Sequence, residues 1–101
     1  MVKHIILWTL NSALSEQEKA AVKKDIKAGL EGLVGRVPGL VEAKVHIDGR
    51  LSSSNADVML DCTLESAEAL EGYARHPEHV AVANTKVRPF TSQRCGLDFE
   101  V

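Results

Sequence analysis

The chain contains few residues of the kinds that mark specialised binding sites. Its only two cysteines, Cys62 and Cys95, are too few and too far apart in sequence for a metal knuckle or a C-x-x-C redox pair. The 12 basic and 14 acidic residues give a formal net charge of -2 and form no basic stripe of the kind that binds phosphate backbones. We therefore expect no nucleic-acid partner.

Long apolar segments are also absent. The apolar run at residues 5–10 is far shorter than the ~20 residues that span a bilayer, and the start Met1-Val2-Lys3 is followed by no small-residue cleavage site. These features predict a cytoplasmic protein without a membrane partner. A chain of 101 residues has the length of a single domain, 1–101.

Hydrophobic periodicity predicts four strands and two main helices. The predicted strands, which alternate or are rich in β-branched residues, cover residues 2–10, 40–48, 56–64 and 91–101. Ser15 and Glu18 form a capping box that begins the first helix, and its inward stripe repeats at spacings of three and four up to Pro38: Val22, Ile26, Leu30, Leu33 and Val37. On the strand at 40–48 the inward set is Val41, Ala43, Val45 and Ile47. Ser66 is expected to cap the second helix. A short third helix from Pro77 to about Asn84 follows, because Pro89 prevents a longer one.

The order β-α-β-β-α-β is the ferredoxin-like arrangement of an α+β protein, in which two helices cover one face of a four-stranded sheet. The first strand is apolar on both faces, with Ile5 and Leu7 on one and a larger set on the other: Val2, His4, Ile6, Trp8 and Leu10. A contiguous exposed apolar face usually marks an interface. We therefore predict a homodimer in which the open sheet faces, carrying Ile5, Leu7 and Met59, enclose a dimeric α+β barrel.

The predicted strand order also bears on the two cysteines. The third and fourth strands flank the first, so Cys62 and Cys95 lie two strand spacings apart. That distance is ~9–10 Å, beyond the ~7 Å limit between Cα atoms for a disulfide. Both are expected to be free thiols.

The most informative stretch of the sequence is Tyr73-Ala74-Arg75-His76-Pro77-Glu78-His79-Val80, which gathers a phenol and two imidazoles around a proline. Pro77 disfavours helical geometry at His76 and suits the first turn of a new helix. His79 then lies in that first turn, where the helix dipole disfavours an imidazolium. With partial burial in addition, we predict a His79 pKa below that of a free histidine. A neutral His79 that faces Tyr73 across a shared cavity forms an acid-base pair.

Each of these residues also has a structural interpretation. Tyr73 and His79 can be core residues with satisfied hydrogen bonds, and His4 can be a buried core histidine. His76 can cap the short helix. A metal site at His76 and His79 is disfavoured because no third ligand is placed by spacing, so we predict no metal.

Four segments resemble the stress-responsive A/B barrel domain family, in the same order and spacing: Val2-Lys3-His4-Ile5-Ile6-Leu7-Trp8, Val37-Pro38-Gly39-Leu40, Ala56-Asp57-Val58-Met59-Leu60, and Tyr73 to Val80. The most specific is the Tyr-x-x-His-Pro-x-His pattern. The resemblance covers essentially the whole chain and implies a dimeric α+β barrel.

The pattern is similar to that of olivetolic acid cyclase, a plant branch of the family that performs an intramolecular aldol condensation on a polyketide thioester without a cofactor. This resemblance implies that His79 and Tyr73 are the catalytic pair and that His4 lines the cavity. We predict the remaining ligand-binding residues to be Ile6, Trp8, Val22, Ile26 and His76. The ligand would be small and apolar or polyketide-like, although the first helix lacks the aromatic residues that furnish the cyclase pocket.

Three classes of function remain open. The first is a small-molecule-binding dimer. The second is a cofactor-free enzyme that uses Tyr73 and His79, either a cyclase or a barrel-type monooxygenase. The third is an interaction dimer with a filled core. A solvent-connected cavity with Tyr73, His79 and His4 on its wall would argue against the third class.

Overall fold

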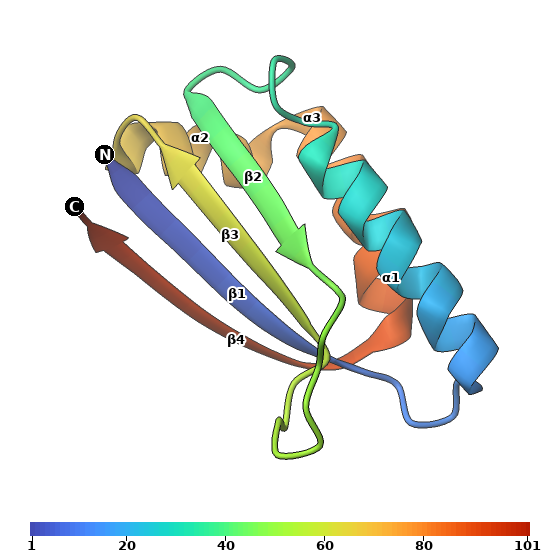
Figure 1. Cartoon of the computed structure of the whole chain (residues 1–101). Helices are drawn as coiled ribbons and strands as arrows, with labels where there is room; N and C mark the ends of the chain where they lie inside the picture. The colour runs from blue at the N-terminus through green and yellow to red at the C-terminus, as the bar shows by residue number, and fades with distance from the viewer.

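A computed structural model describes all residues, 1–101, as one four-stranded antiparallel sheet with its helices on one face (Figure 1). The elements follow in the order β1 Val2–Leu10, α1 Glu16–Glu31, β2 Leu40–His46, β3 Val58–Leu64, α2 Ala67–Arg75, α3 Pro77–Val82 and β4 Thr91–Glu100. The strand order is β2-β3-β1-β4. This confirms the predicted ferredoxin-like α+β fold. None of the helices has the length and apolar composition needed to cross a bilayer.

Helix α1 begins as predicted and ends earlier than predicted. The Ser15 hydroxyl accepts the Glu18 N–H at 3.1 Å, and the Glu18 carboxylate accepts the Ser15 N–H at 2.9 Å. The helix stops at Glu31, not at Val37, and the turns that follow include Gly35 at a φ of 88°, a conformation that no helix interior holds. Leu33 and Val37 are buried nevertheless, because these turns fold back onto the core.

Strand β2 corrects the predicted alternation. Its pairing with β3 shifts register between Leu40 and Glu42, so one extra residue is accommodated there. As a result Leu40 is buried and Val41, which was predicted to point inward with Ala43, is 45% exposed. Ala43 and Val45 keep their predicted inward positions.

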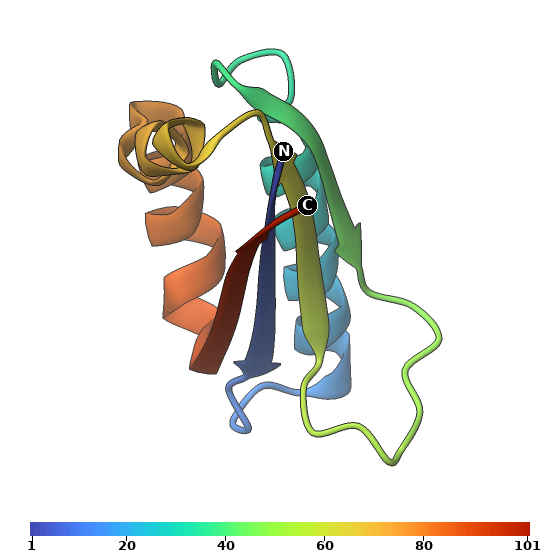
Figure 2. The same ribbon diagram turned by 90° about the vertical axis from the view of Figure 1, so that its left-hand side faces the viewer.

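The helical conformation after Pro77 continues farther than predicted. A π-helical turn at Ala83–Val87 and a 3₁₀ turn at Arg88–Phe90 extend α3 until β4 begins at Thr91. Pro89 does not prevent this, because it lies in the first turn of the 3₁₀ segment, where a missing N–H removes no hydrogen bond. Figure 2 shows α1 behind β2 and β3, with the helical segment after Pro77 toward β4. The two termini lie at the same end of the sheet, where the Val101 N–H donates to the Met1 carbonyl at 3.0 Å.

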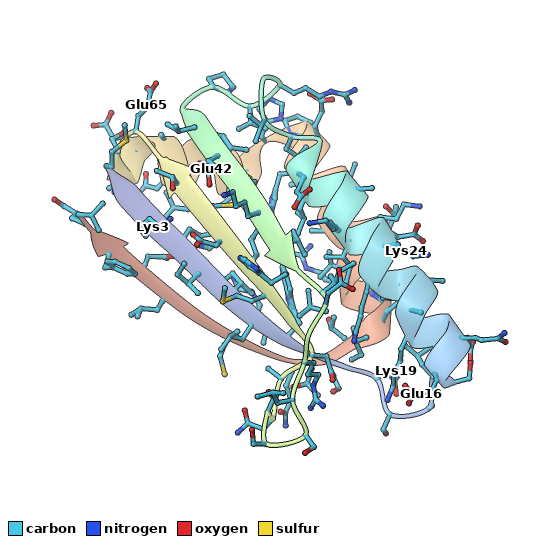
Figure 3. All side chains as sticks on the ribbon, in the orientation of Figure 1. Lys3, Glu16, Lys19, Lys24, Glu42 and Glu65 are labelled. Carbon is cyan, nitrogen blue, oxygen red and sulfur yellow. The ribbon has the colours of Figure 1, made fainter.

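The sheet face opposite the helices carries an apolar band. On β1, Ile5 pairs with Leu97 of β4 and Leu7 pairs with Cys95. Leu97 is 63% exposed and Phe99 42%. Polar side chains border this band, and Figure 3 shows Lys3 and Glu42 on the same face, while Lys24 projects from α1 away from the sheet.

The two cysteines lie on opposite faces of the sheet. Cys62 is fully buried under the helices, and Cys95 is exposed on the open face. The prediction of two free thiols is confirmed.

Candidate functional site

A cavity of about 490 Å³ lies between the helices and the sheet. Its wall combines apolar side chains, two imidazoles, a phenol and two guanidinium groups: His4, Ile6, Trp8, Leu30, Leu60, Tyr73, Ala74, His79, Ala83, Val87, Arg88, Thr91, Ser92, Gln93 and Arg94. Arg88 and the residues of β4 after Thr91 are exposed, so the cavity opens to solvent beside β4. Its volume lies within the ~300–1,000 Å³ range of small-molecule sites.

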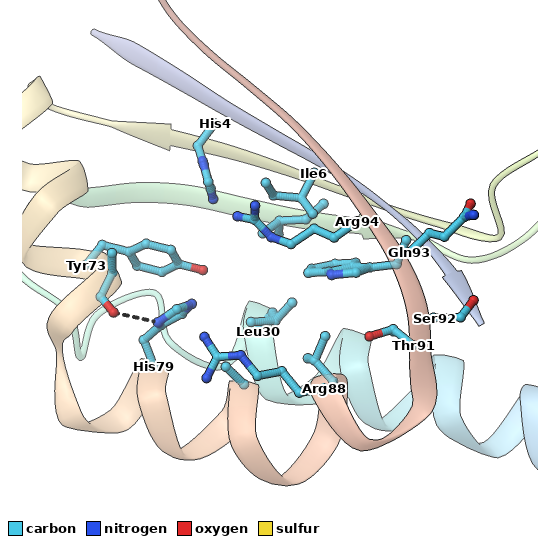
Figure 4. Close-up of a pocket in the computed structure, with 15 residues that line it drawn as sticks. His4, Ile6, Leu30, Tyr73, His79, Arg88, Thr91, Ser92, Gln93 and Arg94 are labelled. Atoms are coloured by element: carbon cyan, nitrogen blue, oxygen red, sulfur yellow. Dashed lines mark hydrogen bonds between the residues drawn. The ribbon is translucent and has the colours of Figure 1, made fainter. Parts of the chain in front are cut away.

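Tyr73 brings a phenol to the cavity from the last turn of α2. The helix begins at Ser66, whose hydroxyl accepts the Ala69 N–H at 3.0 Å, and ends at Arg75 because Pro77 follows. Tyr73 is only 1% exposed, and its hydroxyl group points into the cavity (Figure 4). The only protein group within hydrogen-bonding reach is the Cys62 thiol, at 4.0 Å. Burial raises the pKa of Tyr73, so the phenol remains a proton donor at neutral pH.

His79 lies beside Tyr73, and their ring centroids are 4.3 Å apart. Its Nδ1 lies 3.2 Å from the Ala74 carbonyl oxygen, the contact dashed in Figure 4. A carbonyl only accepts, so Nδ1 carries the hydrogen and a neutral His79 keeps its lone pair on Nε2. The imidazole therefore presents an acceptor next to the phenol donor.

Burial is the main reason that the pKa of His79 is lowered. The positive charges of His4, Arg88 and Arg94 act in the same direction, and the hydrogen bond to Ala74 opposes them. This direction is the one predicted from the sequence, and the two rings line the same cavity, side by side.

His4 approaches Tyr73 from the sheet. It lies on the helix-facing side of β1, with its ring centroid 5.9 Å from that of Tyr73 in an edge-on arrangement. Its Nδ1 is paired with the carboxylate of Asp98 on β4. Asp98 thereby fixes the orientation of the imidazole, and Tyr73 lies between two histidines.

The structure brings together most of the predicted site residues. The predicted residues that line the cavity are Tyr73, His79, His4, Ile6 and Trp8. Val22 and Ile26 do not line it, because they pack into the core from earlier turns of α1, and Leu30, one turn after Ile26, reaches the wall in their place. His76 is also absent from the wall.

His76 has a capping position instead. It is the residue between α2 and α3, and its Nδ1 accepts the Glu78 N–H at 3.2 Å. This hydrogen bond uses one of the unpaired N–H groups at the start of α3. The structural interpretation of His76 therefore fits its geometry.

The sequence interpretation missed the polar wall that β4 supplies. Arg94 is paired with Trp8 and Asp98 with His4, so both face the helices, whereas the apolar set of β4 faces the open side. An alternating strand with one charged set normally exposes that set to water. The register of β4 against β1 is the signal that identifies Arg94 and Asp98 as neighbours of the site.

The residues present do not form a metal site. No group of three or more His, Cys, Asp or Glu side chains is placed to hold a metal ion. His76 and His79 have separate partners, Glu78 N–H and Ala74 carbonyl respectively.

Comparison with known families and structures extends these findings. The family model of the Stress Responsive A/B Barrel Domain, Dabb, matches residues 2–101. No curated protein matches the sequence.

Three solved structures illustrate the similarity of fold. A dimeric protein of unknown function from Bacteroides fragilis is 25% identical, with a TM-score of 0.91 over 99% of this chain and 95% of that chain. A dimeric ferredoxin-like protein of unknown function from Thermobifida fusca is 21% identical, with a TM-score of 0.81 over 99% of this chain and 90% of that chain. The hydroxynitrile lyase from Passiflora edulis is 18% identical, with a TM-score of 0.72 over 97% of this chain and 90% of that chain.

Proposed function

The chain belongs to the stress-responsive A/B barrel domain family, and on that premise we propose that it is a homodimer that binds a small molecule in the cavity between its helices and its sheet. The observation that carries the proposal is the cavity itself. A scaffold with a filled core would bury Tyr73 and His79 against packed side chains, whereas here both line a space of about 490 Å³.

The wall supports a ligand with an apolar body and a carbonyl group. Ile6, Trp8 and Leu30 supply apolar contact surface. At one end the Tyr73 oxygen accepts only a weak contact from the Cys62 thiol, and the Tyr73 O–H has no acceptor in the protein. A carbonyl oxygen of a ligand would satisfy this donor, because a buried O–H gains from a partner.

The dimer would form through the open sheet face. Leu97 and Phe99 extend the apolar band of Ile5 and Leu7, and a contiguous apolar surface of this kind favours self-association. The proteins from Bacteroides fragilis and Thermobifida fusca are described as dimeric, which supports the same assembly here. A two-fold axis across this face would place the cavities on the outer sides of the two sheets.

A second candidate function is acid-base catalysis on the bound molecule, and the specific observation in its favour is the tautomer of His79. With Nδ1–H donated to Ala74, Nε2 can remove a proton from a carbon between two carbonyl groups. Tyr73 would stabilise the enolate oxygen through its O–H. In a cyclase of the olivetolic acid type, the enolate carbon then bonds to a second carbonyl carbon of the same chain, and the alkoxide formed takes a proton from the His79 imidazolium.

Two alternatives to cyclisation would also use His79 as the base. In a cofactor-free monooxygenase the carbanion would react with molecular oxygen, so oxygen uptake distinguishes it. In a lyase, the activity named for the Passiflora edulis protein, His79 would instead remove the proton of a hydroxyl group. The C–O bond would become a carbonyl group as the adjacent carbon–carbon bond breaks, and the departing cyanide would take the proton from the His79 imidazolium. Each reaction requires His79 to be neutral, in agreement with its lowered pKa.

Native mass spectrometry of protein purified without denaturation tests the binding proposal. We expect a dimer with additional mass that is lost on unfolding. NMR spectra of His79 and Tyr73 before and after removal of that molecule should differ, with a surface residue such as Lys24 unchanged. A protein without bound mass whose His79 and Tyr73 signals respond to no member of a fragment library would refute the proposal.

A further inference from the structure

We propose that the ligand of this cavity is a carboxylate whose head group binds Arg94 and Arg88, beside the Tyr73 hydroxyl group and His79. This inference rests on the proposed binding function and specifies the chemical class of the ligand. It is carried by two guanidinium groups that line the same cavity from opposite sides and have no carboxylate partner.

The pairing of charges around the cavity is uneven. Seven pairs of oppositely charged side chains approach within 4.0 Å in the protein, and neither Arg88 nor Arg94 belongs to one. Asp98 is the acidic residue of the site, and it is paired with His4. The residues that line the cavity thus include two permanent positive charges, Arg88 and Arg94, and no acidic side chain.

The sheet is shaped to let Arg94 reach over the cavity. Arg94 and Gly96 both lie on the helix-facing side of β4, opposite Trp8 and Ile6. A Cβ atom at Gly96 would lie 2.8 Å from Ile6 Cδ1 and 3.6 Å from a terminal nitrogen of Arg94. The absence of a side chain at Gly96 thus leaves room for the guanidinium group of Arg94 beside Ile6.

Arg88 approaches from the opposite wall. It follows the π-helical turn, and its guanidinium group donates to the side-chain oxygen of Asn84, one turn earlier. Figure 4 shows the Arg88 guanidinium group beside His79 and the Arg94 guanidinium group beside His4, with the Tyr73 hydroxyl group between them. Both arginines act electrostatically on His79, which places them near the same ring.

A carboxylate matches this arrangement chemically. Guanidinium groups bind carboxylates through two parallel N–H···O bonds, and a partly enclosed site strengthens such bonds. A ligand anchored in this way would direct its next carbonyl group toward the Tyr73 hydroxyl group. The proposed site thus favours an organic acid with a carbonyl group over a neutral molecule of the same shape.

Isothermal titration with benzoate, benzamide and phenyl phosphate tests the inference, because the three probes share a ring and differ in their head group. We expect benzoate to bind at least about tenfold more tightly than benzamide, the effect of one charge-assisted hydrogen bond pair. The Arg94→Gln and Arg88→Gln variants should each reduce benzoate affinity by about tenfold and leave benzamide affinity unchanged. Arg75→Gln is the matched control, since Arg75 is exposed on α2 outside the cavity.

The outcomes separate this inference from the proposed function. Equal binding of benzoate and benzamide, with His79 and Tyr73 shifts in NMR spectra, would overturn the carboxylate inference and leave a small-molecule site. Tighter binding of phenyl phosphate than of benzoate, lost in the arginine variants, would overturn the choice of carboxylate in favour of a phosphate ester. Absence of binding by all three probes to the ligand-free protein would count against both proposals.

Discussion

The Tyr73→Phe substitution separates a ligand-binding tyrosine from a structural one. The ring is 1% exposed and contacts both His79 and His4, at centroid distances of 4.3 and 5.9 Å. Phenylalanine keeps these contacts. The hydroxyl group loses only its contact with the Cys62 thiol at 4.0 Å, a weak donor. We therefore expect a change in the free energy of unfolding of less than ~1 kcal/mol, at the low end of the ~0.5–1.5 kcal/mol of an ordinary hydrogen bond.

Ligand affinity should respond more strongly than stability does. The phenol donates one hydrogen bond to a bound carbonyl group, and its loss corresponds to roughly a 2- to 12-fold increase in Kd. Thermal unfolding measures the change in stability, and it is done at equal chain concentration because the Tm of a dimer depends on concentration. Titration with benzoate or with the molecule identified by mass spectrometry measures the change in Kd.

The Tyr73→Ala variant provides the contrast. Removal of the buried ring should cost about 3–5 kcal/mol, as for other large aromatic truncations, which lowers the Tm by well over 10 °C in a domain of this size. If Tyr73→Phe itself lost more than ~1.5 kcal/mol, the hydroxyl group would be a structural hydrogen-bonding group. If it changed neither stability nor affinity, the phenol would have no role in binding.

Three further predictions follow from the same structure. His79 should titrate below the ~6.5 of a model histidine, because burial lowers its pKa in the folded chain. As the pH falls below about 6.5, the unfolded chain therefore binds a proton that the folded chain does not, and stability falls. The His79→Gln variant should lose less stability over this range, and an equal loss would contradict the assignment. Leu97→Lys on the open face should shift the light-scattering mass from twice the chain mass to the 11.0 kDa of one chain. The control variant Leu51→Lys, at a loop residue that is 71% exposed, should keep the mass of the dimer. If the Leu97→Lys variant remains a dimer, the interface lies elsewhere. Burial raises the pKa of the Cys62 thiol to about 12, so Cys62 should react with thiol reagents only after unfolding. The unfolded protein should then show two reactive thiols per chain without added reductant. Fast reaction of Cys62 in the folded protein would show that its environment is open.

Much of the site was predictable from local sequence. The break at Pro77 separates two helices, and the spacing of six residues between Tyr73 and His79 brings their rings to the same space on either side of that break. The lowered pKa of His79 was predicted in direction, but its main cause is burial, followed by neighbouring positive charges, and not the helix end. Burial of a side chain depends on what packs over it, and local sequence does not contain that information.

The inward stripe of α1 shows the limit of periodicity. Val22, Ile26 and Leu30 share one face at helical spacing, and all three are buried. Only Leu30 reaches the cavity, because the position along the helix axis decides which turn faces it. Periodicity defines a face of a helix, and the docking of that helix on the sheet defines the position along it.

The sequence by itself determined the order of elements, the capping box at Ser15, the break at Pro77 and the apolar character of both faces of β1, because these depend on neighbouring residues and on the periods of helix and strand. Tertiary structure alone decided the role of β4. Its apolar set lies on the open face and its charged set on the cavity, since pairing with β1 aligns Arg94 with Trp8 and Asp98 with His4. An alternating strand can place either set inward, and only its register against a neighbour fixes the choice.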